Sequence, residues 1–298
     1  MAYAGFDRAD CPEISFMARL RAETNLAWCG FYLPAPSQAG TTWKGKRAAL
    51  VAQGWGLAPV YVGQQVTGPG SHLVTAEQGT LDGAHAAQAM AAEGFPQRSW
   101  VYLDLENGPP LSYEQRDYVG AWVDAVEVNG YCAGVYCSFM LAANIASLRP
   151  SARIWAFHVR TTSAHVVGGT TFASPDPATS GFAGASIWQL DDEARIMGGL
   201  AVDLDSASMR DPSAPDNPDV VKSVAVTSPG TGYDTRAPIG VVPVASPKPA
   251  LDLPGPSFPT SSKELVAVIQ TYLVQHGAKI QIDGLWGEKT RDAFMQVV

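Results

Sequence analysis

The chain is short of charged residues, and it contains no hydrophobic run long enough to span a membrane. Charged side chains make up 16% of its 298 residues, with 20 basic against 28 acidic residues. Neither the first 210 residues nor the remainder carries an excess of basic side chains, so we do not expect a nucleic-acid partner. The length is sufficient for one large domain and one smaller domain.

Cysteine and histidine are also scarce, with four and five residues. The cysteines form no Cys-x-x-Cys pair and no histidine lies at zinc-finger spacing, so the sequence predicts no metal site and no cofactor. Most of the cysteines lie in or beside apolar strand-like runs, where free thiols are common. A disulfide between Cys11 and Cys29 remains open, and with it the redox compartment. The four residues are Cys11, Cys29, Cys132 and Cys137.

Motifs of several common enzyme classes are missing. No Gly-x-Gly-x-x-Gly follows the first predicted strand, which counts against a doubly wound nucleotide-binding sheet, the second choice of fold. No Gly-x-Ser-x-Gly elbow supports an esterase site.

Residues 1–7 lack the basic start and apolar core of a signal peptide. Either the protein leaves the cell by another route, or a leader has been removed from it.

The sequence does contain a regular alternation of short apolar strands and helices over residues 1–210. Eight strands in that length predict a (β/α)8 TIM-like barrel of small size. Thr75 and Ser112 are the predicted N-caps of two helices. The predicted strands cover residues 3–7, 28–33, 57–64, 99–106, 132–138, 153–159, 185–190 and 200–204, and the clearest helices cover 13–23, 43–53, 112–129 and 139–147.

The composition changes after residue 210. Residues 211–262 hold half of the 22 prolines among Ser, Thr and Gly, which predicts an extended linker. Residues 263–298 return to the helical spacing of apolar side chains, interrupted by a tight turn. The chain is therefore predicted to consist of an α/β barrel (1–210), a Pro-rich linker (211–262) and a small all-α module (263–298).

One strand carries a pair of carboxylates. Residues 99–106 read Ser-Trp-Val-Tyr-Leu-Asp-Leu-Glu, followed by a turn at Asn107–Pro110. Because side chains alternate along a strand, Asp104 and Glu106 project to the same face, roughly 6–7 Å apart. Carboxylates are costly to place in an apolar core, and acid/base work on a glycosidic bond would account for them. A salt-bridged strand end is the simpler interpretation for such a pair alone.

The other predicted strands end in acidic and aromatic residues too. In a TIM-like barrel the catalytic groups lie at the carboxyl ends of the strands, so we expect these side chains at one mouth. A cluster of carboxylates raises the pKa of at least one member and so supplies a proton donor. Aromatic rings beside carboxylates suit sugar binding, although each ring alone fits barrel packing equally well. The candidates for catalysis are Asp7, Asp104, Glu106 and Asp203, and those for substrate binding are Tyr32, Tyr61, Tyr102, Tyr136, Trp155, Trp188, Gln189 and Asp205.

Five segments resemble a known family in their order along the chain. They are Tyr-Ala-Gly-Phe-Asp7, Val-Tyr-Leu-Asp-Leu-Glu106, Gly-Val-Tyr-Cys-Ser138, Ile-Trp-Gln189 and Ala-Val-Asp-Leu-Asp205. Residues 2–210 are similar to the muramidase barrels of glycoside hydrolase family 25, and more so to the related glycoside hydrolase-like barrel of actinobacteria (DUF1906). The resemblance implies that Glu106 is the general acid, that Asp104 is its partner carboxylate, and that Asp7 and Asp203 line the subsite.

The C-terminal module has a resemblance of its own. Ile282-Asp-Gly-Leu-Trp-Gly-Glu-Lys-Thr-Arg-Asp-Ala-Phe294 looks like a type-1 peptidoglycan-binding domain, although the last helix of that family is missing. This resemblance implies wall binding through Asp283, Gly284, Trp286 and Gly287. The leading hypothesis is a muramidase that cleaves peptidoglycan glycan strands and is held on the wall by this module. The alternatives are a non-catalytic glycan-binding or structural protein of a phage tail or cell envelope, and an enzyme for another wall polysaccharide. Together with the missing signal peptide, the resemblance implies an extracellular, cell-wall or virion protein such as a phage lysin, or a secreted protein whose leader has been removed.

Overall fold

The computed structural model describes residues 2–36, 39–66, 72–159 and 163–215, together with isolated positions between residues 270 and 289. Nearly all of the predicted linker lies outside these residues, as do Asp283, Gly284, Trp286 and Gly287 of the predicted module. The barrel belongs to a compact unit, Met1–Asp216. Within the described ranges, no helix is long and apolar enough to cross a membrane. All four cysteines are free thiols, so the structure has no Cys11–Cys29 disulfide.

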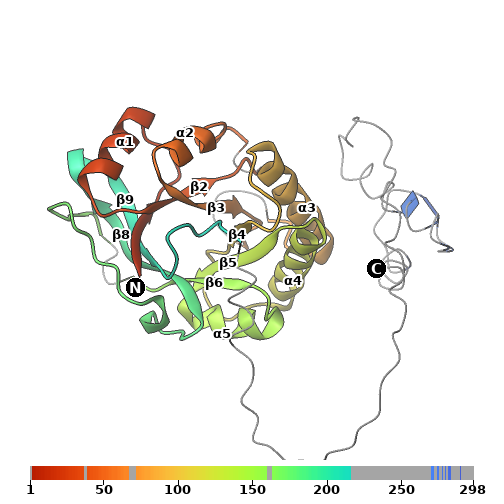
Figure 1. The fold of residues 1–298 in the computed structure, drawn as a ribbon. Coiled ribbons are helices and arrows are strands. Elements are labelled where there is room, and N and C mark those ends of the chain that lie inside the picture. The colour runs from red at the N-terminus through yellow and green to blue at the C-terminus, as the bar shows by residue number, and fades with distance from the viewer. Residues whose placement is uncertain are drawn as a thin grey trace, which may run out of the picture. The chain divides into compact units, whose positions relative to one another are not determined.

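The described part of this unit forms a closed barrel of eight strands with helices around it (Figure 1). Around the barrel the order is β1, β2, β3, β4, β5, β6, β8 and β9, and pairing of β9 with β1 completes the ring. The two-residue strand β7 (His165–Val166) pairs with an extension of β8. The barrel strands are β1 (Tyr3–Asp7), β2 (Trp28–Tyr32), β3 (Gly56–Val62), β4 (Trp100–Asp104), β5 (Cys132–Ser138), β6 (Arg153–Phe157), β8 (Ala185–Arg195) and β9 (Ala201–Ala207).

Within the described ranges, five α-helices cover the outer face of the barrel along β1–β6, as Figure 1 shows. Thr75 and Ser112 accept hydrogen bonds at two helix starts, as predicted, and Ser112 forms a full capping box with Gln115. The helix predicted over residues 43–53 is shorter than expected. The helices are α1 (Ile14–Glu23), α2 (Arg47–Ala52), α3 (Ala76–Ala92), α4 (Tyr113–Val128) and α5 (Phe139–Leu148).

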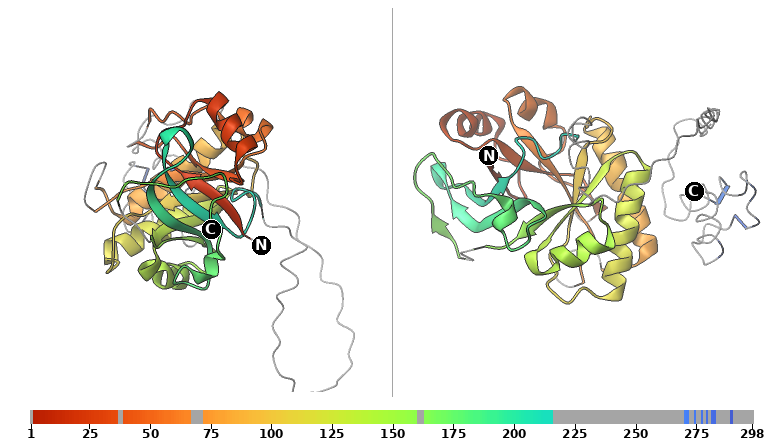
Figure 2. Two further views of the ribbon diagram at one scale, coloured as in Figure 1. Left: turned by 90° about the vertical axis from the view of Figure 1, so that its left-hand side faces the viewer. Right: turned by 60° about the horizontal axis from the view of Figure 1, so that its bottom comes forward.

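The last strand differs from the prediction in direction. β9 runs antiparallel to both β8 and β1, whereas a (β/α)8 barrel has eight parallel strands. Only residues 196–200 join β8 to β9, and this connection is too short for a parallel crossover. Figure 2 (left) looks at this side of the barrel, where the described chain places no α-helix over β8 and β9.

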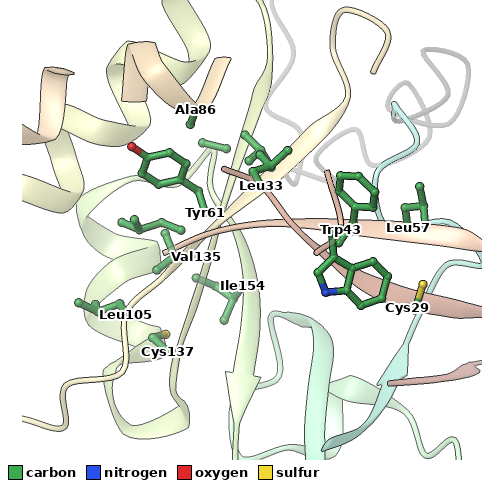
Figure 3. Close-up of a cluster of buried hydrophobic side chains, with 14 of the residues drawn as sticks. Cys29, Leu33, Trp43, Leu57, Tyr61, Ala86, Leu105, Val135, Cys137 and Ile154 are labelled. Atoms are coloured by element: carbon green, nitrogen blue, oxygen red, sulfur yellow. The ribbon is translucent and has the colours of Figure 1, made fainter. Parts of the chain in front are cut away.

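Two apolar layers hold the barrel together. The outer layer fills the space between the strands and the helices, and Figure 3 shows part of it, including Tyr61, Ala86 and Val135. The inner layer fills the barrel itself around Trp28 and Trp155, whose ring centroids lie 5.6 Å apart in an edge-to-face contact. Gly5 on β1 makes room for this packing, because a Cβ atom there would lie 2.1 Å from the ring of Trp28.

The amino ends of the strands are closed by residues 211–213. The Asp211 carboxylate accepts from the Leu57 amide, and the carbonyl oxygens of Pro212 and Ser213 accept from the Tyr102 hydroxyl and the Trp100 amide. The first residues of the predicted linker therefore form part of the barrel unit. Any polar ligand entering the barrel has to enter from the opposite end, where the strands β1–β6 finish.

Candidate functional site

Acidic side chains from β1, β4 and β9 meet at the carboxyl end of the barrel. Asp7 is the last residue of β1 and lies directly opposite Asp203 on β9. Asp104 is the last residue of β4, and its pKa is raised by the nearby charges of both Glu106 and Asp7 after the larger effect of burial. The structure thus brings together the four carboxylates predicted for catalysis.

Asp203 reaches this end for a different reason from the one predicted. The sequence placed it at the carboxyl end of a parallel strand, but β9 is antiparallel and Asp203 lies in its first half. Asp205 follows two residues later on the same face and therefore lies deeper, opposite Gly5. Its exposed fraction is 1%, and its Oδ1 accepts a 3.0 Å hydrogen bond from Trp155 Nε1. Direct substrate contact, which the sequence predicted for Asp205, is therefore wrong.

A pocket of about 240 Å³ opens beside the carboxylates. Glu106 is exposed at this pocket, while Asp7 and Asp104 are 5% and 7% exposed. A larger hollow of about 380 Å³ between α4 and α5 is lined by Arg116 and small or apolar residues, without a carboxylate, and we do not assign it a role. The pocket beside the carboxylates is lined by Leu105, Glu106, Tyr136, Ser138, Phe157, Gln189, Asp192 and Asp203.

The buried carboxylates are only partly hydrogen-bonded. The Tyr32 hydroxyl donates to Asp7 Oδ1 at 2.7 Å. Among the described residues, no donor reaches Asp7 Oδ2, Asp104 Oδ1 or Asp205 Oδ2 as long as the carboxyl groups are ionised. Leaving buried carboxylate oxygens unpaired is costly, so protons on some of these groups are favoured.

The pKa values follow from this burial. Burial raises the pKa of Asp7 to about 6, although the hydrogen bonds from Tyr32 and Asp205 lower it. Burial and the charge of Asp7 raise the pKa of Asp203 to about 8, against the effect of the Glu193 amide, which donates to Asp203 Oδ1. Burial also raises the pKa of Asp104 and of Asp205 well above the usual range. Near neutral pH the site therefore combines protonated and ionised carboxyl groups.

The predicted substrate-binding side chains divide into two sets. Tyr136 and Gln189 line the pocket, and Tyr32 lies beside it through its bond to Asp7. Tyr102 and Trp155 lie deep in the barrel, with exposed fractions of 0% and 1%, and Tyr102 donates to the closed end. Substrate contact predicted for these two residues is therefore wrong, because the inner aromatic layer buries them beneath the pocket.

Two further aromatic residues point away from the barrel interior. Tyr61 follows the inward-facing Val60 and so packs outward against α3, where its hydroxyl lies 3.1 Å from His85 Nδ1 (Figure 3). Trp188 lies between the inward-facing Ile187 and Gln189, and its Nε1 donates to the carbonyl oxygen of His158. Substrate contact at the pocket, as predicted for Tyr61 and Trp188, is therefore wrong.

Sequence reasoning missed several residues of the site. Ser138 and Phe157 end β5 and β6 on the inward face, and their alternation with Tyr136 and Trp155 is a signal that could have found them. Asp192 reaches the pocket because β8 is irregular between Gln189 and Ala194, and no sequence pattern announces that irregularity. In the described ranges, no group of three His, Cys, Asp or Glu side chains is arranged to hold a metal ion.

Solved structures with a similar fold were found. An uncharacterized protein of B. stearothermophilus has a TM-score of 0.50 and 18% identity, over 70% of this chain and 97% of that one. The spore cortex lytic enzyme SleM of Clostridium perfringens has a TM-score of 0.44 and 14% identity, over 74% and 69%. The catalytic domain of endolysin ply40 from Listeria monocytogenes bacteriophage P40 has a TM-score of 0.40 and 12% identity, over 75% and 97%.

The first of these similarities supports the barrel fold and nothing more, given its low identity. No curated protein matches the chain. The model of one protein family, however, matches residues 20–194, a segment that includes Asp104, Glu106 and the pocket residues up to Asp192. Asp7, Asp203 and Asp205 lie outside the matched segment. This match covers more than half of the chain, which therefore belongs to the Rv2525c-like, glycoside hydrolase-like domain family.

Proposed function

We propose that the barrel is a glycoside hydrolase that cleaves the glycan strands of peptidoglycan, as a muramidase does. The observation that carries the proposal is the meeting of Glu106, Asp104, Asp7 and Asp203 beside one open pocket. Hydrolysis of a glycosidic bond needs a carboxylic acid that protonates the leaving oxygen and a carboxylate that balances the positive charge on the sugar. Both protonation states are favoured in this cluster near neutral pH.

The exposed fractions and pKa values of the carboxyl groups suggest a role for each of the four residues. Glu106 is the exposed carboxyl group at the pocket and donates the proton to the departing oxygen. Asp7, with a pKa of about 6, is ionised at pH 7 and stabilises the oxocarbenium-like transition state. Asp203, with a pKa of about 8, keeps its proton at pH 7 and donates a hydrogen bond to a sugar hydroxyl. Burial and the neighbouring charge of Glu106 raise the pKa of Asp104, so Asp104 is favoured in its protonated form and adds no second negative charge beside Glu106.

The test is the release of reducing ends from purified peptidoglycan between pH 4 and pH 8. We expect wild-type protein to release them and Glu106→Gln to lose the activity while wall binding stays intact. Asp117→Asn, which changes an exposed carboxylate on α4, is the matched control and keeps full activity. If the wild-type protein releases no reducing ends at any pH from peptidoglycan or from other wall polysaccharides, the alternative of a non-catalytic glycan-binding or structural protein takes its place. Release from another wall polysaccharide alone would change the proposed substrate.

We also propose that the C-terminal residues hold the enzyme on the wall, as the resemblance to peptidoglycan-binding domains implies. Tethering would raise the local concentration of glycan strands at the barrel. In the full chain, Trp286→Ala is expected to weaken binding to insoluble peptidoglycan and to leave hydrolysis of soluble glycan fragments unchanged. Equal binding by the wild-type and substituted chains would contradict this role.

A further inference from the structure

The side-chain amide of Gln65 joins the loop after β3 to the carboxylate pair after β4. Its Nε2 donates to the carbonyl oxygen of Asp104 at 2.9 Å, and its Oε1 accepts from the amide of Glu106 at 3.2 Å. Gln65 is 4% exposed, so water competes little for these two bonds. One side chain thus fixes the backbone on both sides of Leu105.

The two hydrogen bonds prolong the sheet beyond its last backbone pair. The register of β3 with β4 ends at Val62 and Asp104. A neighbouring parallel strand would bond one carbonyl group and the amide two residues later, and Gln65 bonds that same pair of groups with its side chain. On the other side, the Leu105 amide donates to the carbonyl oxygen of Tyr136 at 3.0 Å. The segment that carries Asp104 and Glu106 is therefore held from both sides.

Gln65 is itself held by a buried network behind the loop. The backbone amide of Gln64 donates to the Tyr118 hydroxyl, and its side-chain amide donates to Asp82 Oδ2 at 3.0 Å. Tyr118 also donates to Asp82, which is 2% exposed on α3. The backbone at Gln64 therefore has a fixed position relative to α3 and α4, and the side chain of Gln65 starts from a fixed neighbour.

We propose that Gln65 is a positioning residue that sets the backbone, and thereby the carboxyl group, of Glu106 at the pocket. The inference rests on the proposed function, in which Glu106 donates the proton. A carboxyl group on an exposed strand end has rotational freedom, and an error of about 1 Å in the position of a catalytic group costs up to roughly 100-fold in rate. Gln65 limits that freedom without touching the substrate, and the sequence patterns that identify catalytic residues do not include it.

The test compares Gln65→Met, which removes both hydrogen bonds, with Gln65→Glu, which keeps the size of the side chain. A protonated Glu reproduces one donor and one acceptor, but an ionised Glu cannot donate to Asp104. For Gln65→Met we expect kcat to fall roughly 10- to 100-fold with KM changed less than about 2-fold. For Gln65→Glu we expect activity near wild type at the acid end of the profile and a growing deficit as the pH rises.

Amide hydrogen exchange is a second measurement, and it tests the position of the Glu106 backbone independently of enzyme activity. We expect the Glu106 amide to exchange its hydrogen faster in Gln65→Met, by about 10-fold or more, while the Leu105 amide keeps its protection. Gln53→Met is the control, because Gln53, the C-cap of α2, donates a 2.9 Å hydrogen bond to the carbonyl oxygen of Ile14 and so joins α2 to α1. It should change stability without changing kcat or exchange at Glu106.

The outcomes separate the two proposals. Any one of three results overturns the positioning role. They are a kcat of Gln65→Met equal to that of the wild type, an activity of Gln65→Glu relative to wild type that stays constant across the pH range, and unchanged hydrogen exchange at the Glu106 amide in Gln65→Met. A wild-type chain that releases no reducing ends contradicts the hydrolase proposal instead. In that case amide exchange alone decides whether Gln65 fixes the backbone of Glu106.

Discussion

The carboxyl groups of Asp7 and Asp205 meet inside the barrel and share a hydrogen bond. Tyr32 donates to Oδ1 of Asp7 and Trp155 donates to Oδ1 of Asp205, which leaves one unpaired oxygen on each carboxyl group. A hydrogen bond between the two carboxyl groups requires a proton on one of them. The hydrogen bond lowers the pKa of Asp7 and raises that of Asp205, so Asp205 holds the proton and Asp7 ionises first.

The raised pKa of Asp7 makes the folded protein less stable as the pH increases. An ordinary Asp has a pKa near 3.8, whereas folded Asp7 has a pKa of about 6, so between these values the folded state binds more protons than the unfolded state. The free energy of unfolding therefore falls by about 3 kcal/mol for this group as the pH rises from about 3 to about 7, and most of that fall lies between pH 4 and pH 6. Asp203, with a pKa of about 8, extends the decline towards pH 8.

We expect Asp7→Asn to remove the Asp7 part of this decline. An Asn side chain can accept from Tyr32 and donate to Asp205, and it does not titrate. Chemical denaturation at intervals from pH 4 to pH 8 should show a smaller loss of stability in Asp7→Asn than in wild type, chiefly between pH 4 and pH 6. Asp117→Asn on the exposed side of α4 should follow the wild-type curve. Parallel curves for Asp7→Asn and wild type would show that Asp7 is not a buried titrating group.

The hydrogen bond from Tyr32 to Asp7 predicts a shift in the pH profile of activity. If ionised Asp7 stabilises the transition state, kcat/KM rises as the pH passes through about 6. Tyr32→Phe removes a donor to the ionised form, so the pKa of Asp7 should increase and the rise in activity should move up by roughly one pH unit. Tyr61→Phe loses a hydroxyl contact on the outer face of β3 and should leave the profile in place. A Tyr32→Phe profile superimposable on wild type would remove Asp7 from the proposed mechanism.

Much of the fold could be predicted because local signals agree with it. Apolar runs, helix caps and glycine-containing turns mark the strands and helices up to β6, and Ser112 forms the predicted cap. The direction of β9 could not be read from its own residues, since apolar alternation is the same for parallel and antiparallel strands. β8 also extends to Arg195, because residues 191–193, whose acidic side chains favour a turn in isolation, are held in the hairpin with β9.

The carboxylates of the site were predictable and the aromatic side chains largely were not. Asp7 and Asp104 end β1 and β4, and the parallel strands of such a barrel turn their carboxyl ends toward the open mouth, whereas Asp203 reaches the same mouth because β9 is antiparallel. For a ring, the same position along the chain can mean the pocket, as for Tyr136, or the outer layer, as for Tyr61. The difference lies in the alternation of each strand and in how deep the inner layer packs, and both depend on contacts between distant strands.

The close approach of β2 to Asp7 predicts that position 30 accepts only glycine. A Cβ atom on Gly30 would lie 2.6 Å from the Cβ and 3.3 Å from the Cα of Asp7, so Gly30→Ala forces Asp7 or its strand to move. We expect Gly30→Ala to lower the free energy of unfolding by about 1–3 kcal/mol, because the barrel interior has no room to absorb a methyl group.

The displaced Asp7 carboxylate in Gly30→Ala should also reduce kcat, since its charge no longer faces the sugar. Gly40→Ala is the matched control, because no atom of the described residues lies within 4 Å of a Cβ built there, and it should retain wild-type stability and activity. Wild-type melting and kinetics in Gly30→Ala would mean that Asp7 does not stand against β2 in solution, and the proposed alignment of Asp7 with the pocket would then be wrong.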